Sequence, residues 1–155
     1  MHGGLMGEIS GFLLWRAGNT WQRKIRKLLK LYGLTPAQYL LLAGVGSLQL
    51  DLGAPVTQVS LARHCGTDQM MTSQIIRVLQ QANLVRRSKH KGDGRAVIIE
   101  ITDKGMVAAR DAGAEVEAAD TAFHAVLGEN AGSFADALHV LMGEKIRRRV
   151  KAVAL

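Results

Sequence analysis

Cysteine is nearly absent from this sequence, and long apolar runs are missing altogether. Cys65 is the one cysteine among 155 residues, so no intrachain disulfide can form and the sequence fits a reducing compartment. No segment reaches roughly 18 uninterrupted apolar residues, which predicts that no helix spans a bilayer. The N-terminus lacks the basic region, apolar run and small-residue cleavage site of a secretory signal. We therefore expect a soluble, cytoplasmic protein.

Motifs of catalysis are missing as well. The sequence has no nucleophile–base arrangement, no glycine-rich phosphate loop and no zincin helix. It therefore predicts no catalytic residue, no cofactor and no enzyme activity.

Basic charge, in contrast, is plentiful and unevenly distributed. Lys and Arg number 20 against 13 Asp and Glu, which favours a polyanionic partner, nucleic acid ahead of a membrane surface. Residues 16–30 carry six cations and no acid, and residues 86–95 carry five cations and one acid. Residues 106–144 reverse the sign, with seven acids and one cation. Charges sorted in this way predict one side that faces a polyanion and another side with a different task.

Apolar spacing and capping residues predict long helices at the start of the chain. Residues 5–32 have apolar side chains at helical spacing with cations between them, and Gly33 can end this helix in the left-handed conformation. Thr35-Pro36-Ala37-Gln38 combines a capping box with proline at the first helical position. The second helix is expected to run from there to about Leu48, followed by a loop over residues 51–55.

The C-terminal third is predicted to form two further long helices. Thr102 is expected to cap a helix over residues 103–126, Gly128 breaks it, and a last helix covers about residues 132–153. We expect one domain over residues 1–155, in which residues 1–33 and 105–155 pair two chains and residues 34–104 bind DNA.

The middle of the chain has the order of a helix-turn-helix. A short helix over residues 57–64, with Val59, Leu61 and Ala62 facing inward, is followed by a turn at Cys65-Gly66-Thr67. Asp68 caps the next helix, which is expected to reach Ala82 and to bury Ile75, Val78 and Leu79. Asn83 can take the left-handed conformation that ends it.

The second helix of such a motif enters the major groove and reaches base edges with its N-terminal half. Glutamine can bond adenine, hydroxyls read donors or acceptors, and methionine can touch the thymine methyl group. The same residues also fit an ordinary solvated helix face. The residues predicted to read DNA are Gln69, Met70, Thr72, Ser73, Gln74 and Arg77.

A basic hairpin follows this helix. Strands are expected over residues 84–88 and 96–101, the second because of its β-branched run, with a glycine-bearing loop between them. Asp93 is expected to shape the turn and orient Arg95, which could enter a narrow minor groove. A charged, solvated loop is the alternative reading. The cations predicted to meet DNA are Arg86, Arg87, Lys89, Lys91 and Arg95.

In order and spacing, these segments resemble the MarR family. The resemblance rests on Leu61-Ala62, the helix Met71–Leu79, Leu84-Val85-Arg86-Arg87, Asp93-Gly94-Arg95 and Ile101-Thr102-Asp103-Lys104-Gly105, with Gly33–Tyr39 upstream. Asn83 stands where the family usually has glycine, Arg86 where it has glutamate, and Ile101 where it has leucine. The arginine puts in doubt a salt bridge that the glutamate often makes.

The resemblance implies a mainly α fold with a small β-hairpin wing, a winged helix-turn-helix flanked by long dimerisation helices. It implies a homodimer that regulates transcription on double-stranded DNA, usually as a repressor released by small ligands, oxidation or metals. A palindromic operator also requires two helix-turn-helix motifs, and one chain supplies only one of them. The expected walls of an effector site are Trp15, Trp21 and Tyr39, which also fit a plain core. The rival interpretation is a winged-helix module for protein or RNA contact.

Three further features could mark a functional site, but no site is predicted at any of them. Cys65 lies in the turn of the motif, where a structural role is expected rather than a redox switch. Glu117, Asp120 and His124 share one helix face, which His139 could join, but solvated acids explain them as well, so no metal site is predicted. His64 and His90 flank the DNA-binding region, and no role is assigned to either.

Overall fold

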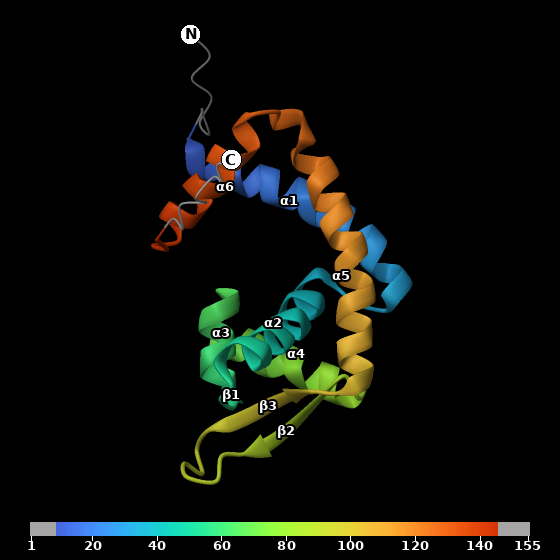
Figure 1. Cartoon of the computed structure of the whole chain (residues 1–155), viewed down its shortest axis with the longest axis vertical. Helices are drawn as coiled ribbons and strands as arrows, with labels where there is room; N and C mark the ends of the chain where they lie inside the picture. Colours follow the sequence, from blue (N-terminus) through green and yellow to red (C-terminus); the bar gives the residue numbers. More distant parts are fainter. Residues whose placement is uncertain (1–8, 146–155) are drawn as a thin grey trace, which may run out of the picture. The chain divides into compact units, whose positions relative to one another are not determined.

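The computed structural model describes residues 9–145 of the chain (Figure 1). The chain divides between Ala119 and Asp120 into two compact units. The first unit contains α1 (Ser10–Leu29), the 3₁₀ turn η1 (Lys30–Tyr32), α2 (Pro36–Leu52), β1 (Val56–Thr57), α3 (Gln58–Cys65), α4 (Gln69–Gln81), β2 (Val85–Lys89), β3 (Val97–Ile101) and most of α5 (Asp103–His124). The second contains the end of α5, the 3₁₀ turn η2 (Ala125–Leu127) and α6 (Asn130–Leu141).

The three strands form one antiparallel sheet in the order β1–β3–β2. β2 and β3 pair along their whole length, with Val85 opposite Ile101 and Lys89 opposite Val97. Figure 1 shows this hairpin extending beyond α2, α3 and α4 as a wing. The predicted fold class, mainly helical with a small β-hairpin wing, is confirmed. β1 was not predicted, because two residues carry no readable periodicity.

One apolar core holds the wing and the helices of the first unit together. Burying a large aliphatic side chain contributes about 1.5–3 kcal/mol, so the core fixes α4 and the sheet in one arrangement. The sheet and the three middle helices contribute the fully buried Leu41, Leu42, Val45, Val56, Leu61, Ile76, Leu79 and Ile99. α1 and α5 add Ile25, Leu29, Ala112 and Val116.

Local capping signals place most helix ends where the sequence predicts them. The Gln38 backbone N–H donates to Thr35 Oγ1 at 3.2 Å, and the Thr35 N–H donates to Gln38 Oε1 at 2.9 Å. Gly33 and Asn83 adopt φ values of 66° and 59°, the left-handed conformation expected of them. The predicted end of α2 at Leu48 is wrong, because the helix continues to a left-handed cap at Gly53.

The start of α5 is fixed to the turn between α4 and β2. The Thr102 backbone N–H donates to the Leu84 carbonyl at 3.0 Å, and the Gly105 N–H donates to Thr102 Oγ1 at 3.0 Å, which confirms Thr102 as the cap. A Cβ at residue 105 would lie 2.0 Å from the Leu84 carbonyl oxygen. Only glycine allows this approach, which gives the Thr102–Gly105 motif a physical reason.

In the second unit, α5 ends at His124. Gly128 adopts a φ of 54°, which confirms the predicted break of the helix at this glycine. His124 Nδ1 lies 3.0 Å from the Asp120 carbonyl oxygen, and its ring contacts Phe123 and Phe134. The predicted last helix is wrong in extent, because α6 begins at Asn130 and ends at Leu141. The remainder of that prediction, residues 146–153, lies outside the described residues.

Candidate DNA-binding surface

The outer face of α4 presents polar side chains at helical spacing. The Asp68 carboxylate accepts a hydrogen bond from the Met71 backbone N–H at 2.7 Å and begins the helix as predicted. The face toward the core consists of Thr72, Ile76 and Leu79. The opposite face exposes Gln69, Met70, Gln74 and Arg77, whereas Ser73 is half-buried. Met70 is 72% exposed, an unusual position for a large apolar side chain on a helix that also has a buried face.

The expectation that Thr72 reads DNA is wrong for the described structure, because its side chain is fully buried. Its hydroxyl donates to the Asp68 carbonyl at 2.7 Å and lies 2.8 Å from Thr67 Oγ1. Thr72 therefore fastens the turn to α4.

The error in Thr72 is one of helix phase. Val78, expected in the core, is 45% exposed, and Ile75 is only half-buried, so the buried face is rotated toward Thr72 and Ile76. The same kind of error affects Val59 on α3, which is 52% exposed, while Leu61 and Ala62 are buried as predicted.

The wing presents four of its five predicted cations to solvent. Arg86, Lys89, Lys91 and Arg95 are exposed. Arg87 differs, because it pairs with the fully buried Ile99 across the strands and is half-buried. Its Nε is buried without a hydrogen-bond partner. Arg87 is therefore oriented by the sheet, whereas the other four cations extend into solvent.

Hydrogen bonds define the loop at the tip of the wing. The Arg95 backbone N–H donates to Asp93 Oδ1 at 3.0 Å, which confirms the predicted role of Asp93 in the turn. The Gly92 and Asp93 backbone N–H groups both donate to His90 Nδ1, at 3.0 and 3.1 Å. No role was predicted for His90 from the sequence. The sequence feature that could have indicated this role is the position of His90, a hydrogen-bonding side chain two residues before Gly92. An asparagine at this spacing forms a local turn.

The surroundings of two glutamines, Gln49 and Gln58, were also not predicted from the sequence. Gln49 Oε1 accepts a hydrogen bond from the Ile101 backbone N–H at 2.6 Å, on the edge of β3 beyond the end of β1. It completes the strand with a side chain from α2, 52 residues away, so no local pattern could reveal it. Gln58 begins α3, and its Oε1 is buried without a hydrogen-bond partner.

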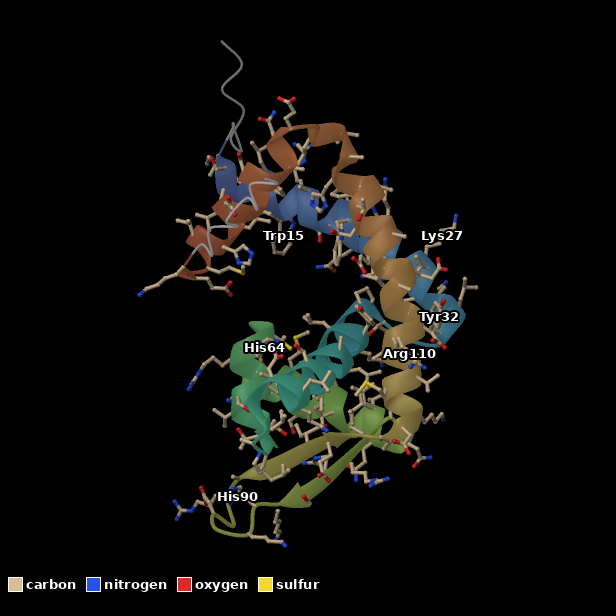
Figure 2. The ribbon with its side chains drawn as sticks, in the orientation of Figure 1. Trp15, Lys27, Tyr32, His64, His90 and Arg110 are labelled. Carbon is tan, nitrogen blue, oxygen red and sulfur yellow. The ribbon has the colours of Figure 1, made fainter. Side chains whose placement is uncertain are left out.

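The three residues expected to line an effector site lie in different surroundings. Trp21 and Tyr39 are half-buried and pack against the core. Burial, and then the charge of Glu117, raise the pKa of the Tyr39 hydroxyl. Trp15 is 72% exposed and projects from α1 (Figure 2), where it borders an apolar depression of about 460 Å³ with Ile9 and Phe12.

Cys65, the last residue of α3, packs against α2. Its Sγ lies 3.7 Å from the Leu40 carbonyl oxygen, and a Cβ on Gly44 would lie 2.6 Å from it. Burial raises the pKa of the Cys65 thiol. Among residues 9–145, no three His, Cys, Asp or Glu side chains gather in a way that could hold a metal ion. His139 Nδ1 instead lies 2.6 Å from Glu144 Oε2.

Known proteins resemble this chain both in sequence and in fold. The profile of the MarR family matches residues 34–97, which cover α2 to the start of β3. The HTH-type transcriptional regulator YdcH of Bacillus subtilis is 38% identical over 74% of this chain and 78% of its own. The chain belongs to the MarR family.

Two further relatives widen the comparison. The HTH-type transcriptional repressor Rv2887 of Mycobacterium tuberculosis is 28% identical over 71% of this chain and 76% of its own length. The crystal structure of CouR from Rhodococcus jostii RHA1, bound to p-coumaroyl-CoA, superposes with a TM-score of 0.73. It is 25% identical and covers 90% of this chain and 96% of its own.

Membership identifies α3 and α4 as the helix-turn-helix and the β2–β3 hairpin as its wing. The chain is thus a DNA-binding transcription regulator. Within the described residues, no helix is both long and apolar enough to cross a membrane.

Proposed function

We propose that this MarR-family protein acts in the cytoplasm as a homodimer that represses transcription from a palindromic operator and is released by a small-molecule effector. The observation that carries the DNA-binding part is the pairing of an exposed polar face on α4 with an exposed basic wing. In this proposal, Gln69, Met70, Ser73, Gln74 and Arg77 reach base edges. Arg86, Lys89, Lys91 and Arg95 meet phosphates or the minor groove, and Arg87 supports them from the sheet.

An exposed apolar patch at the start of α1 supports the homodimer. Trp15 is 72% exposed and Ile9 is 55% exposed, and they share one short stretch of helix with other large apolar side chains. A patch of this kind on a monomer is typical of an interaction site. A second copy fits best, because a two-fold dimer pairs the same patch on both chains. The patch consists of Ile9, Phe12, Leu13, Leu14 and Trp15.

The effector and the direction of regulation come from relatives. Rv2887 is described as a repressor, and CouR was crystallised with p-coumaroyl-CoA. In this chain, the half-buried Trp21 and Tyr39 are the aromatic side chains that we assign to the effector site. Trp15 belongs in our proposal to the dimer patch or to an effector site completed by the second chain.

Selection of binding sites from a pool of random-sequence duplexes tests the proposal. We expect the enriched sequences to converge on an inverted repeat whose half-sites lie about one helical turn apart. A single asymmetric half-site would contradict the palindromic dimer. Failure to enrich any duplex, with capture of RNA in a parallel pool, would favour the rival winged-helix interaction module.

A further inference from the structure

The wing tip contains a histidine that accepts two backbone hydrogen bonds. His90 lies in the loop of the hairpin (Figure 2), and its Nδ1 accepts the N–H groups of Gly92 and Asp93. The His90 backbone N–H in turn donates to the Ala96 carbonyl at 3.0 Å, and the Ala96 N–H donates to the Asp93 carbonyl at 3.0 Å. Together with the bond from Arg95 N–H to Asp93 Oδ1, these contacts join five residues of the loop in one hydrogen-bond network.

This network identifies the acceptor nitrogen of the His90 ring. An N–H group can donate only to an acceptor, so a nitrogen that receives two N–H donors cannot carry a proton itself. Nδ1 is therefore the acceptor nitrogen of the His90 ring, and Nε2 is the nitrogen that carries a proton. The imidazole takes the place of the side-chain oxygen with which asparagine accepts N–H groups two residues ahead in a local turn.

We propose that His90 is a positioning residue that pre-organises the wing tip for DNA, so that Arg95 reaches the duplex from a fixed loop. The proposal rests on the DNA-binding role proposed above and adds a residue to it. Gly92 and Gly94 give the loop wide conformational freedom, which must be lost when the tip meets DNA. A loop held by His90 loses that freedom during folding, and binding then costs less.

The path from His90 to Arg95 is short. His90 holds the Asp93 N–H, and Asp93 Oδ1 holds the N–H of Arg95. No hydrogen bond from the imidazole needs to reach DNA, so His90 acts through Asp93.

Two substitutions of His90 and one control test the proposal. His90→Ala removes the acceptor of the Gly92 and Asp93 N–H groups. His90→Asn restores an acceptor at the right spacing from Gly92. His64→Ala is the matched control, because it also replaces a histidine of the first unit but lies on α3, away from the hairpin (Figure 2).

The first readout uses the protein without DNA. In His90→Ala, we expect the backbone amides of Gly92 and Asp93 to exchange with solvent about tenfold faster, while His90→Asn and His64→Ala keep wild-type rates. Nitrogen NMR of the wild-type ring should show Nδ1 unprotonated and Nε2 protonated. A proton on Nδ1, or unchanged amide exchange in His90→Ala, would overturn the proposal.

The second readout is affinity for a duplex that the wild-type protein has enriched from a random pool. We expect His90→Ala to bind about tenfold more weakly, and His90→Asn to recover most of that loss. Equal losses in both variants would overturn a positioning role, because the acceptor would not then be the feature that matters. If the wild-type protein binds no duplex, the proposed function fails, and the exchange and NMR readouts still decide whether His90 fixes the loop.

Discussion

Gly105→Ala should be the most destabilising single-methyl change in the DNA-binding half of the chain. The new Cβ would lie 2.0 Å from the Leu84 carbonyl oxygen and 2.9 Å from Ile101 Cγ1. The carbonyl belongs to the backbone and accepts the Thr102 N–H, so it cannot move away without losing that bond. Overpacking costs about 1–3 kcal/mol and a lost hydrogen bond about 1 kcal/mol, which together give about 3 kcal/mol. For a chain of this length, that loss lowers Tm by about 6–12 °C.

Gly46→Ala is the matched control, because Gly46 is also a buried helical glycine. Its Cβ would meet Ile101 Cδ1 at 3.5 Å, an ordinary contact, so we expect a gain of about 0.5–1 kcal/mol from helix propensity. Urea unfolding followed by circular dichroism, at one protomer concentration, measures all three proteins. Wild-type stability in Gly105→Ala would refute the close approach of α5 to the Leu84 carbonyl.

Three further predictions concern charge, assembly and the cysteine. The logarithm of the DNA association constant should fall with the logarithm of salt concentration, with a slope on the order of −5 or steeper, because exposed wing cations of two subunits release counterions from DNA. A slope near zero would contradict contact between these cations and DNA phosphates. Light scattering should give twice the chain mass for the wild type and a shift toward monomer for Trp15→Ser, whose exposed indole lies in the apolar patch; a wild-type monomer at micromolar concentration would contradict the dimer. Burial raises the pKa of Cys65, so at a given pH less thiolate is present and iodoacetamide should react more slowly with the folded protein than with the urea-unfolded chain; equal rates would contradict its burial.

Local signals predicted several helix ends, because each of these ends depends on a few adjacent residues. Thr35, Asp68 and Thr102 cap helices through their own side chains, and Asn83 ends α4 by its own backbone conformation. The β2–β3 hairpin was likewise readable, since a β-branched run and a glycine-bearing loop lie next to each other in the sequence.

The wrong or missing predictions concern side-chain orientations and contacts, which depend on the other helices and strands that an element packs against. Whether Thr72 or Val78 faces inward depends on where α3 and the sheet contact α4, and apolar spacing alone favoured Val78. Gln49 acts on a strand 52 residues away. The His90 network was missed because histidine is not a residue from which a turn is usually predicted. The outer face of α4 was therefore predicted in outline, with Thr72 and Val78 expected on the wrong sides of the helix.

Whether α4 reads base sequence is tested most directly by titrating Gln74→Ala against the enriched duplex and a random duplex at one salt concentration. Gln74 is exposed on the outer face of α4, so its loss should leave the fold intact and remove a base-edge contact. The variant should lose about 1–3 kcal/mol on the enriched duplex and almost nothing on the random one. Arg95→Ala, at the wing tip, should weaken both complexes more evenly. Equal losses of Gln74→Ala on the two duplexes would contradict the assignment of α4 as the reading helix.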